Sequence, residues 1–187
     1  MKKVMFFLLT SSFLIVACNN DKKDDSSEKK ESMSSENKEN MTQSADSKAE
    51  KNRQTALASV MAVNSHDVDA MLKDATPDGA DYGDGSMPPI KGLDSVKAAI
   101  KGWMNSFPDI KGENLEALSN ANGSKVIVVG EWSATFKKDF MGMKATNKSY
   151  KIWDGDLFTF NDEGKITSHR SIQSGMTSMM QVGAKMR

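Results

Sequence analysis

The sequence predicts an α+β fold in which N-terminal helices pack inside a curved antiparallel sheet that encloses one internal cavity. Two observations lead to this prediction. Apolar residues recur at helical spacing between residues 52 and 107, and segments with strand patterns follow between residues 114 and 173. Helices followed by a run of strands are typical of α+β proteins. We expect the pocket between sheet and helices to be mostly apolar, with a few polar groups.

Two helical segments open the folded part. The first covers 52–75 and contains a break at NSHD, where the apolar spacing is interrupted. The second covers 93–107 and stops at Pro108, because a proline ring cannot continue a helix. Between them, 76–92 is dense in Gly, Pro and Asp, which predicts a loop with room for a short strand at 80–82.

The second half of the chain contains the strand candidates. The segment 125–138, KVIVVGEWSATFKK, has apolar residues at both alternating sets of positions, so both faces of this strand are apolar. It is therefore expected at the centre of the sheet. The next candidate is 147–160, and a turn at NDEG leads into 165–173. An earlier strand near 114–119 would pair beside them, and the tail from residue 174 is a loop or a short helix.

The first fifty residues differ in composition from the rest. Lys2 and Lys3 precede an apolar run, VMFFLLTSSFLIVA, which is too short to be a comfortable membrane span. The run ends in Ala17 and Cys18, and the sequence IVAC resembles a bacterial lipobox, in which cleavage precedes a cysteine that receives the lipid. We predict a lipoprotein signal peptide over 1–17 and lipidation of Cys18. An ordinary secretory signal with a free cysteine is the alternative.

The lipobox resemblance implies a protein of the bacterial cell envelope that is attached to the membrane by the lipid on Cys18. Asn19 favours the outer over the inner membrane in bacteria that use this sorting rule. Residues 18–50 are mostly Asn, Ser, Lys, Asp and Glu, which cannot bury enough apolar area to compensate the entropy of ordering. We therefore expect 18–50 to be a disordered tether and 51–187 to be the folded domain.

Charge and motif content argue against several classes of function. The chain has 25 cationic and 25 acidic residues, so its balance gives no reason to expect a nucleic acid partner. Two histidines and one cysteine do not support a zinc site, and the single cysteine allows no intrachain disulfide. Neither a nucleophile elbow nor a phosphate loop is present. We expect no metal and no cofactor.

A row of polar side chains marks the last predicted strand. Period-2 alternation places Thr167, His169, Ser171 and Gln173 on one face of this strand. His169 is the residue of this row whose ordinary pKa, about 6.5, suits proton transfer near neutral pH. It is a candidate base or ligand contact, and the alternative is a histidine that faces solvent or is bonded internally.

The order and spacing of several segments resemble a known family. The resemblance covers about residues 52–183, and it rests on NSHDVDAML, IKGLDSVKAAIKGWMNSFPDI, EWSATFKKDFMGMKATNKSYKIWDGDLFTFNDEGKI and HRSIQSGMTSMMQVG. These segments are similar to the SnoaL-like polyketide cyclase (ester cyclase) branch of the nuclear transport factor 2-like superfamily. The resemblance implies a cone-shaped α+β barrel around one cavity, with the polar row of the last strand facing that cavity.

One departure from the family concerns its general base. The family usually places a catalytic Asp at the end of the last strand, and the corresponding residue here is Gln173, which cannot accept a proton near neutral pH. His169 could replace this base, as could Asp154 or Asp156. The two aspartates flank Gly155, however, and an exposed bulge or strand edge is the alternative for them.

Three functional hypotheses follow. The first is a lipid-anchored domain that binds a small apolar ligand in its cavity without the cyclase base. The second is a cyclase or ketosteroid isomerase-like enzyme that uses His169 or an Asp as its base. The third is an interaction module that forms a homodimer or pairs with an envelope partner. The candidate ligand contacts are Gln173, Ser171, Tyr82, Trp103 and Trp132. For Trp103 and Trp132, the alternative is that they are ordinary core residues.

Overall fold

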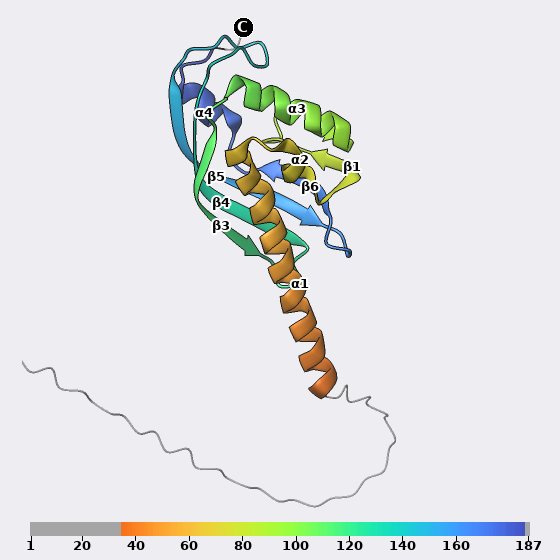
Figure 1. Cartoon of the computed structure of the whole chain (residues 1–187). Helices are drawn as coiled ribbons and strands as arrows, with labels where there is room; N and C mark the ends of the chain where they lie inside the picture. Colours follow the sequence, from red (N-terminus) through yellow and green to blue (C-terminus); the bar gives the residue numbers. More distant parts are fainter. Residues whose placement is uncertain (1–34, 186–187) are drawn as a thin grey trace, which may run out of the picture. The chain divides into compact units, whose positions relative to one another are not determined.

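A six-stranded curled sheet and a layer of helices over one of its faces make up the domain (Figure 1). The computed structural model describes residues 35–185, and these residues belong to one compact unit. The predicted signal peptide and the lipidation site at Cys18 lie outside the described residues. The α+β class expected from the sequence is confirmed.

The break at NSHD is present and α3 (Leu93–Ser106) lies where the apolar spacing predicted, but the first helical segment ends at Leu72 and Ala75 already belongs to a strand. His66 has a φ of 56° at this break, and the Asp67 side chain then accepts a hydrogen bond from the Ala70 amide to cap the next helix. The helical elements are α1 (Ser35–Met61), the short 3₁₀ helix η1 (Ala62–Ser65), α2 (Val68–Leu72), α3 (Leu93–Ser106) and α4 (Gly175–Gln181).

The start of α1 corrects the expected domain boundary. The sequence suggested a disordered tether up to residue 50, but the helix begins at Ser35. Lys, Glu, Gln and Ala are good helix formers, so this stretch can extend a helix whose later turns are anchored. Ala49 supplies such an anchor because it is buried, and Lys48 pairs with Asp162 across the domain.

The sheet has the strand order β2-β1-β6-β5-β4-β3. All neighbouring pairs are antiparallel except β1 and β6, which are parallel, so the expected antiparallel sheet is corrected at this pair. No hairpin joins β1 to β6, and the chain connectivity therefore does not force them to run in opposite directions. The strands are β1 (Ala75–Asp81), β2 (Ile90–Lys91), β3 (Lys111–Ser119), β4 (Lys125–Thr135), β5 (Ser149–Phe160) and β6 (Ile166–Ser171).

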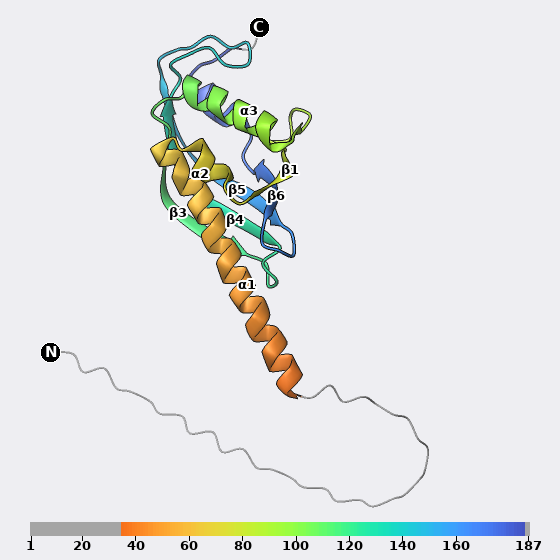
Figure 2. The same ribbon diagram turned by 45° about the vertical axis from the view of Figure 1, so that its right-hand side comes forward.

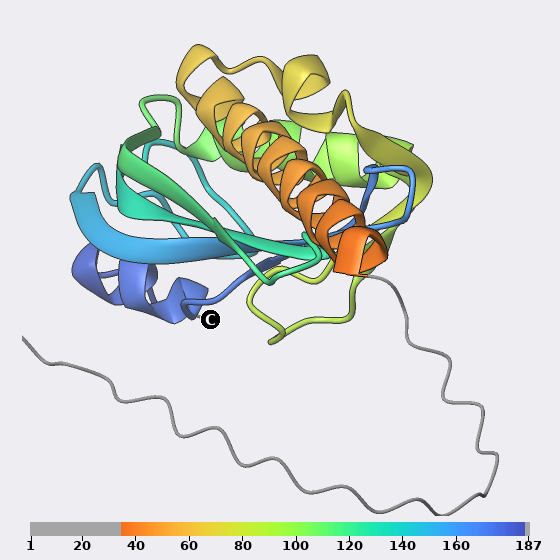
Figure 3. The ribbon, with the colours of Figure 1, turned by 90° about the horizontal axis from the view of Figure 1, so that it is seen from below.

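The core lies between the sheet and the helices α1, α2 and α3, which cover one face (Figures 2 and 3). Val126 and Val128 of β4 are fully buried, whereas Ile127 and Val129 on the other face of the strand are half-buried. Phe107 stacks on Phe136 with ring centroids 5.2 Å apart, and Tyr150 meets Phe107 edge-on. This aromatic group closes the core where α3 ends.

Strand β6 differs from the prediction at both of its ends. A register shift where β6 pairs with Thr159 and Phe160 puts Ile166 and His169 on the same inward face, although simple alternation separated them. The strand also stops at Ser171, before Gln173. From there α4 runs beside β5, and the Gln173 side-chain amide donates a 2.8 Å hydrogen bond to the Trp153 carbonyl.

Candidate functional site

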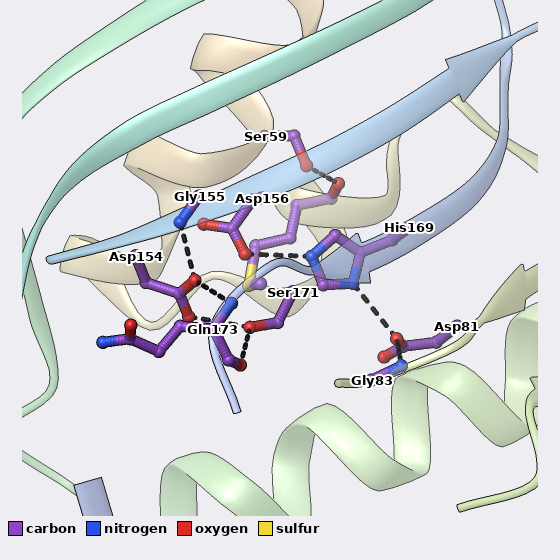
Figure 4. Close-up of polar contacts among 10 residues, drawn as sticks. Ser59, Asp81, Gly83, Asp154, Gly155, Asp156, His169, Ser171 and Gln173 are labelled. Carbon is purple, nitrogen blue, oxygen red and sulfur yellow. Dashed lines mark hydrogen bonds and ion pairs between the residues drawn. The ribbon is translucent and has the colours of Figure 1, made fainter. Parts of the chain in front are cut away.

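A cluster of polar side chains faces inward where β1, β5 and β6 lie side by side (Figure 4). Asp81 comes from the end of β1, Asp154 and Asp156 from β5, and His169 and Ser171 from β6. The register places Asp156 opposite Ser171, and Asp81 opposite His169. Three neighbouring strands therefore bring together groups that are far apart in the sequence.

His169 is held between two carboxylates. Its Nδ1 lies 3.1 Å from Asp81 Oδ1, and its Nε2 lies 3.0 Å from Asp156 Oδ1 (Figure 4). Burial opposes a charge on the imidazole, but the hydrogen bonds and negative charges of Asp156 and Asp81 outweigh burial and raise the pKa of His169 to about 10. At neutral pH the ring is therefore protonated and donates from both nitrogens. It has no lone pair with which to act as a base.

The two carboxylates beside His169 differ in their remaining contacts. Asp81 Oδ1 also accepts a 2.8 Å hydrogen bond from the Gly83 amide. Burial favours its neutral form, but the contacts with His169 and Gly83 prevail, so the pKa of Asp81 is lowered. Asp156 Oδ2, in contrast, is buried and has no hydrogen-bond partner within the described part of the chain. Such an atom has free capacity to accept a proton or a hydrogen bond.

Asp154 forms a second polar contact group beside the first. Its Oδ2 accepts a 2.7 Å hydrogen bond from the Ser171 hydroxyl, and its Oδ1 accepts one of 2.8 Å from the backbone amide of Gln173. Burial raises the pKa of Asp154, the charge of Asp156 adds to the rise, and these hydrogen bonds oppose it. Asp154 and Asp156 thus point inward and are partly buried, which corrects their interpretation as an exposed bulge.

A small cavity adjoins His169 on the side of α3. Its volume is about 40 Å³, well below the several hundred Å³ of a typical small-molecule pocket. The internal cavity expected from the sequence is thus small at this place. The walls are almost entirely apolar, and the lining residues include Leu72, Ala75, Leu93, Val96 and Ile166 as well as Asp81 and His169.

Most of the other predicted contacts lie outside this cavity. Trp132 is buried in the core and its ring lies over Gly112, while Trp103 packs against the same core. Tyr82 sits in the loop after β1, where the Arg170 guanidinium lies 5.0 Å from its ring centroid. Ser171 and Gln173 bond to Asp154 instead of lining the cavity.

Sequence reasoning missed Asp81 as a member of the site. It lies in a segment dense in Asp, Gly and Pro, where turn chemistry explains each residue without any function. Only the pairing of β1 with β6, 88 positions apart along the chain, reveals the contact between Asp81 and His169. No local pattern could have indicated this contact.

Comparison with known protein families agrees with the curled sheet. The model of the SnoaL-like polyketide cyclase family matches residues 52–182. The chain belongs to the SnoaL-like polyketide cyclase family. This match covers nearly all of the described domain, from the middle of α1 to the end of α4.

Solved structures with the same fold include several SnoaL-like proteins. A candidate polyketide cyclase from Xanthomonas campestris pv. campestris has 20% identity and a TM-score of 0.66, over 73% of this chain and 99% of that one. A phenazine biosynthesis-related protein from Pseudomonas aeruginosa has 19% identity and a TM-score of 0.64, over 78% and 93%. A candidate polyketide cyclase from Pseudomonas putida KT2440 has 19% identity and a TM-score of 0.63, over 71% and 98%.

At these identities the SnoaL-like neighbours establish the fold and not the reaction. No curated protein sequence matches the chain. Within residues 35–185, no helix is long and apolar enough to cross a membrane, and no group of three or more His, Cys, Asp or Glu side chains is arranged to hold a metal ion. The residues that bear on the chemistry of this SnoaL-like domain are therefore those of its own polar cluster.

Proposed function

We propose that this SnoaL-like domain binds a small apolar molecule, or the apolar end of a larger one, in the cavity between β1, β6 and α3. The observation that supports this proposal is an apolar cavity whose lining residues include the paired Asp81 and His169. Its 40 Å³ accommodates only a short apolar group, so a longer ligand must displace α3 or extend outward.

The His169 group acts in this proposal as a fixed polar end wall. Because both ring nitrogens already donate to carboxylates, the imidazolium orients a ligand by charge and shape and does not abstract a proton from it. This differs from the hypothesis of His169 as a base, and it agrees with the hypothesis of a binding domain.

The binding proposal is tested by filling the cavity. Wild type and Ala80→Phe are titrated with a panel of short-chain ketones, alcohols and carboxylic acids, and two-dimensional NMR is used to follow amide shifts. We expect saturable shifts at residues of β1, β6 and α3 that disappear in Ala80→Phe. Ala58→Phe, at an exposed position of α1, is the matched control and should bind like wild type. The absence of saturable shifts across the panel would contradict binding at this cavity.

A second candidate function is proton transfer by a carboxylate, and it is favoured by Asp156 Oδ2, which is buried without a hydrogen-bond partner among the described residues. Asp156 does not line the cavity, so a substrate has to displace part of the polar cluster to reach this atom. A proton would leave a carbon beside a carbonyl group and pass to Asp156 Oδ2, and the electron pair would move to the carbonyl oxygen as an enolate. The positive charge of His169 would stabilise this enolate. Asp154, whose pKa is raised, is the neighbouring group that could exchange the proton.

Solvent deuterium exchange separates the two candidates. Enolisable ketones are incubated with wild type, Asp156→Asn and the exposed control Asp162→Asn in D₂O, and label at the α-carbon is measured by mass spectrometry. Proton transfer by Asp156 predicts a loss of roughly 100-fold or more in Asp156→Asn and no loss in the control. Saturable binding without exchange would leave binding as the function.

We also propose that the chain is attached to the bacterial envelope by a lipid on Cys18, as its lipobox-like sequence suggests. Metabolic labelling with a radioactive fatty acid in a bacterial host should label wild type and leave Cys18→Ser unlabelled. The same variant should move from the membrane fraction to the soluble fraction or keep its uncleaved signal. Equal labelling of both proteins would contradict this attachment.

A further inference from the structure

One end of the domain gathers lysines and exposed methionines. It is formed by the connection between β4 and β5, residues 136–148, and by the segment 175–185 that includes α4. Both segments lie at the same end of the domain in Figures 1 and 2. A Cβ atom built on Gly183 would lie 3.6 Å from Lys148 Nζ, so the two segments are in contact range. We call these two segments the cationic tip.

The cationic tip is strongly positive, although the whole chain has a formal net charge of +0. Asp139 is the single acid of the β4–β5 connection, and it is paired with Lys144. From residue 164 onward the sequence contains no Asp or Glu, so the neighbouring segment adds only the cation of Lys185. The exposed lysines of the connection are Lys137, Lys138, Lys144 and Lys148.

Two long apolar side chains project from the same end. Met141 is 63% exposed and Met180 is 74% exposed. Phe140 and Met143, in contrast, pack against the core and anchor the connection. Met141 has a φ of 47° in a tight turn whose ends are joined by hydrogen bonds between Phe140 and Met143, so the turn holds Met141 outward.

We propose that the cationic tip docks onto an anionic lipid surface. The lysines would contact the headgroups, and Met141 and Met180 would insert among them. Exposed apolar side chains next to lysines are the pattern of proteins that bind at the membrane interface. A soluble polyanion would engage the lysines but would leave the methionines in water, so the combination fits a lipid surface. The tip lies at the end of the domain opposite to the start of α1 (Figures 1 and 2).

The test measures cosedimentation of residues 34–187 with vesicles of phosphatidylcholine, alone or mixed with phosphatidylglycerol. This fragment omits the predicted signal peptide, which would itself insert into vesicles. Within the described chain no buried core residue precedes Ala49, so the fragment keeps the whole core. Thermal melts followed by circular dichroism check that every variant is folded. We expect binding to the anionic vesicles alone, and a steep loss of binding as salt is raised.

Two pairs of variants test the two components of the surface. Lys137→Gln with Lys138→Gln should weaken binding by about 25-fold, since a lysine near an anionic membrane contributes about fivefold. The control is Lys51→Gln with Lys91→Gln, two exposed lysines on α1 and β2, and it should bind like wild type.

The apolar component is tested in the same assay. Met141→Ser should weaken binding roughly fivefold, whereas Met87→Ser, at a loop position that is 60% exposed, should have no effect. Equal binding to neutral and anionic vesicles would overturn the proposal. Binding that is insensitive to the tip lysines, or binding to soluble polyphosphate without binding to vesicles, would overturn it as well.

Discussion

At the scale of single residues, His169 is the centre of the site because it connects three strands. Its ring donates to Asp81 of β1 and to Asp156 of β5, while its own backbone belongs to β6. The ring also lies 5.2 Å from the buried ring of Phe158. One side chain thus links the two halves of the sheet on either side of β6.

The charge of His169 should make stability depend on pH. Its folded pKa of about 10 is above the unfolded value of about 6.5, so its contribution is complete below pH 6.5 and is lost as pH rises toward 10. His169→Gln should lower the free energy of unfolding by about 2 kcal/mol at pH 6. Urea unfolding at pH 6 and pH 9.5 should show that this difference shrinks; a constant difference would contradict a protonated His169.

At the scale of elements, α4 replaces the missing end of β6. Where β6 stops, the Gln173 side-chain amide donates a hydrogen bond to the Trp153 carbonyl, and the Lys151 backbone amide donates one to the side-chain oxygen of Gln181. Val182, just after α4, is completely buried and fixes the helix end to the core. The Gln173 side chain is therefore bonded to the backbone of β5. This explains why a residue expected as a ligand contact lies away from the cavity.

The contact between α1 and the β3–β4 turn gives a prediction at the element scale. Gly123 has a φ of 69°, and a Cβ atom there would lie 2.5 Å from the Ala49 Cα of α1. Gly123→Ala should therefore lower the free energy of unfolding by roughly 3 kcal/mol, since a strained backbone and a clash with main chain add up.

A matched control for Gly123→Ala is Gly142→Ala. Gly142 also has a positive φ, 79°, but a Cβ atom there would meet nothing within 4 Å. Gly142→Ala should lower the free energy of unfolding only by the cost of the strained backbone, about 1 kcal/mol. Thermal or urea unfolding of both variants measures the difference, and equal losses would show that the contact with α1 does not contribute.

At the scale of the whole molecule, the outer face of the sheet is the surface that could join two domains. Trp153 is 58% exposed on this face, and Leu118 and Ile172 are also exposed there. Exposed apolar groups of this size often mark interaction sites. We propose that this face supports the homodimer suggested by the sequence, with an envelope partner as the alternative.

Sedimentation velocity tests the homodimer directly. Residues 34–187 should sediment as a dimer at micromolar concentration, and Trp153→Lys should shift the protein to a monomer because a buried charge disfavours the interface. Lys125→Ala, at an exposed position of β4, is the control and should leave the dimer intact. A wild-type monomer across the concentration range would contradict self-association.

Local patterns in the sequence were enough to predict the class of most elements and their order along the chain. Helical and strand periodicities are local properties, so α3 and β4 appeared within a few residues of their predicted ends. Alternation grouped His169 with Thr167 and Ser171 on one face, and the family resemblance implied that this face points inward. The bulge that moves Ile166 to the same face followed from neither. The start of α1 at Ser35 was missed because composition describes the average of a segment and not the anchoring of its end.

The state of His169 depends on contacts between strands that are far apart in the sequence. Asp81 and Asp156 reach it through strand pairings that join distant parts of the chain, and no local periodicity encodes such a pairing. These two carboxylates turn a candidate base into a protonated group with both nitrogens occupied. The size of the cavity was likewise decided by packing, because the volume left between β1, β6 and α3 depends on how all of their side chains fit together.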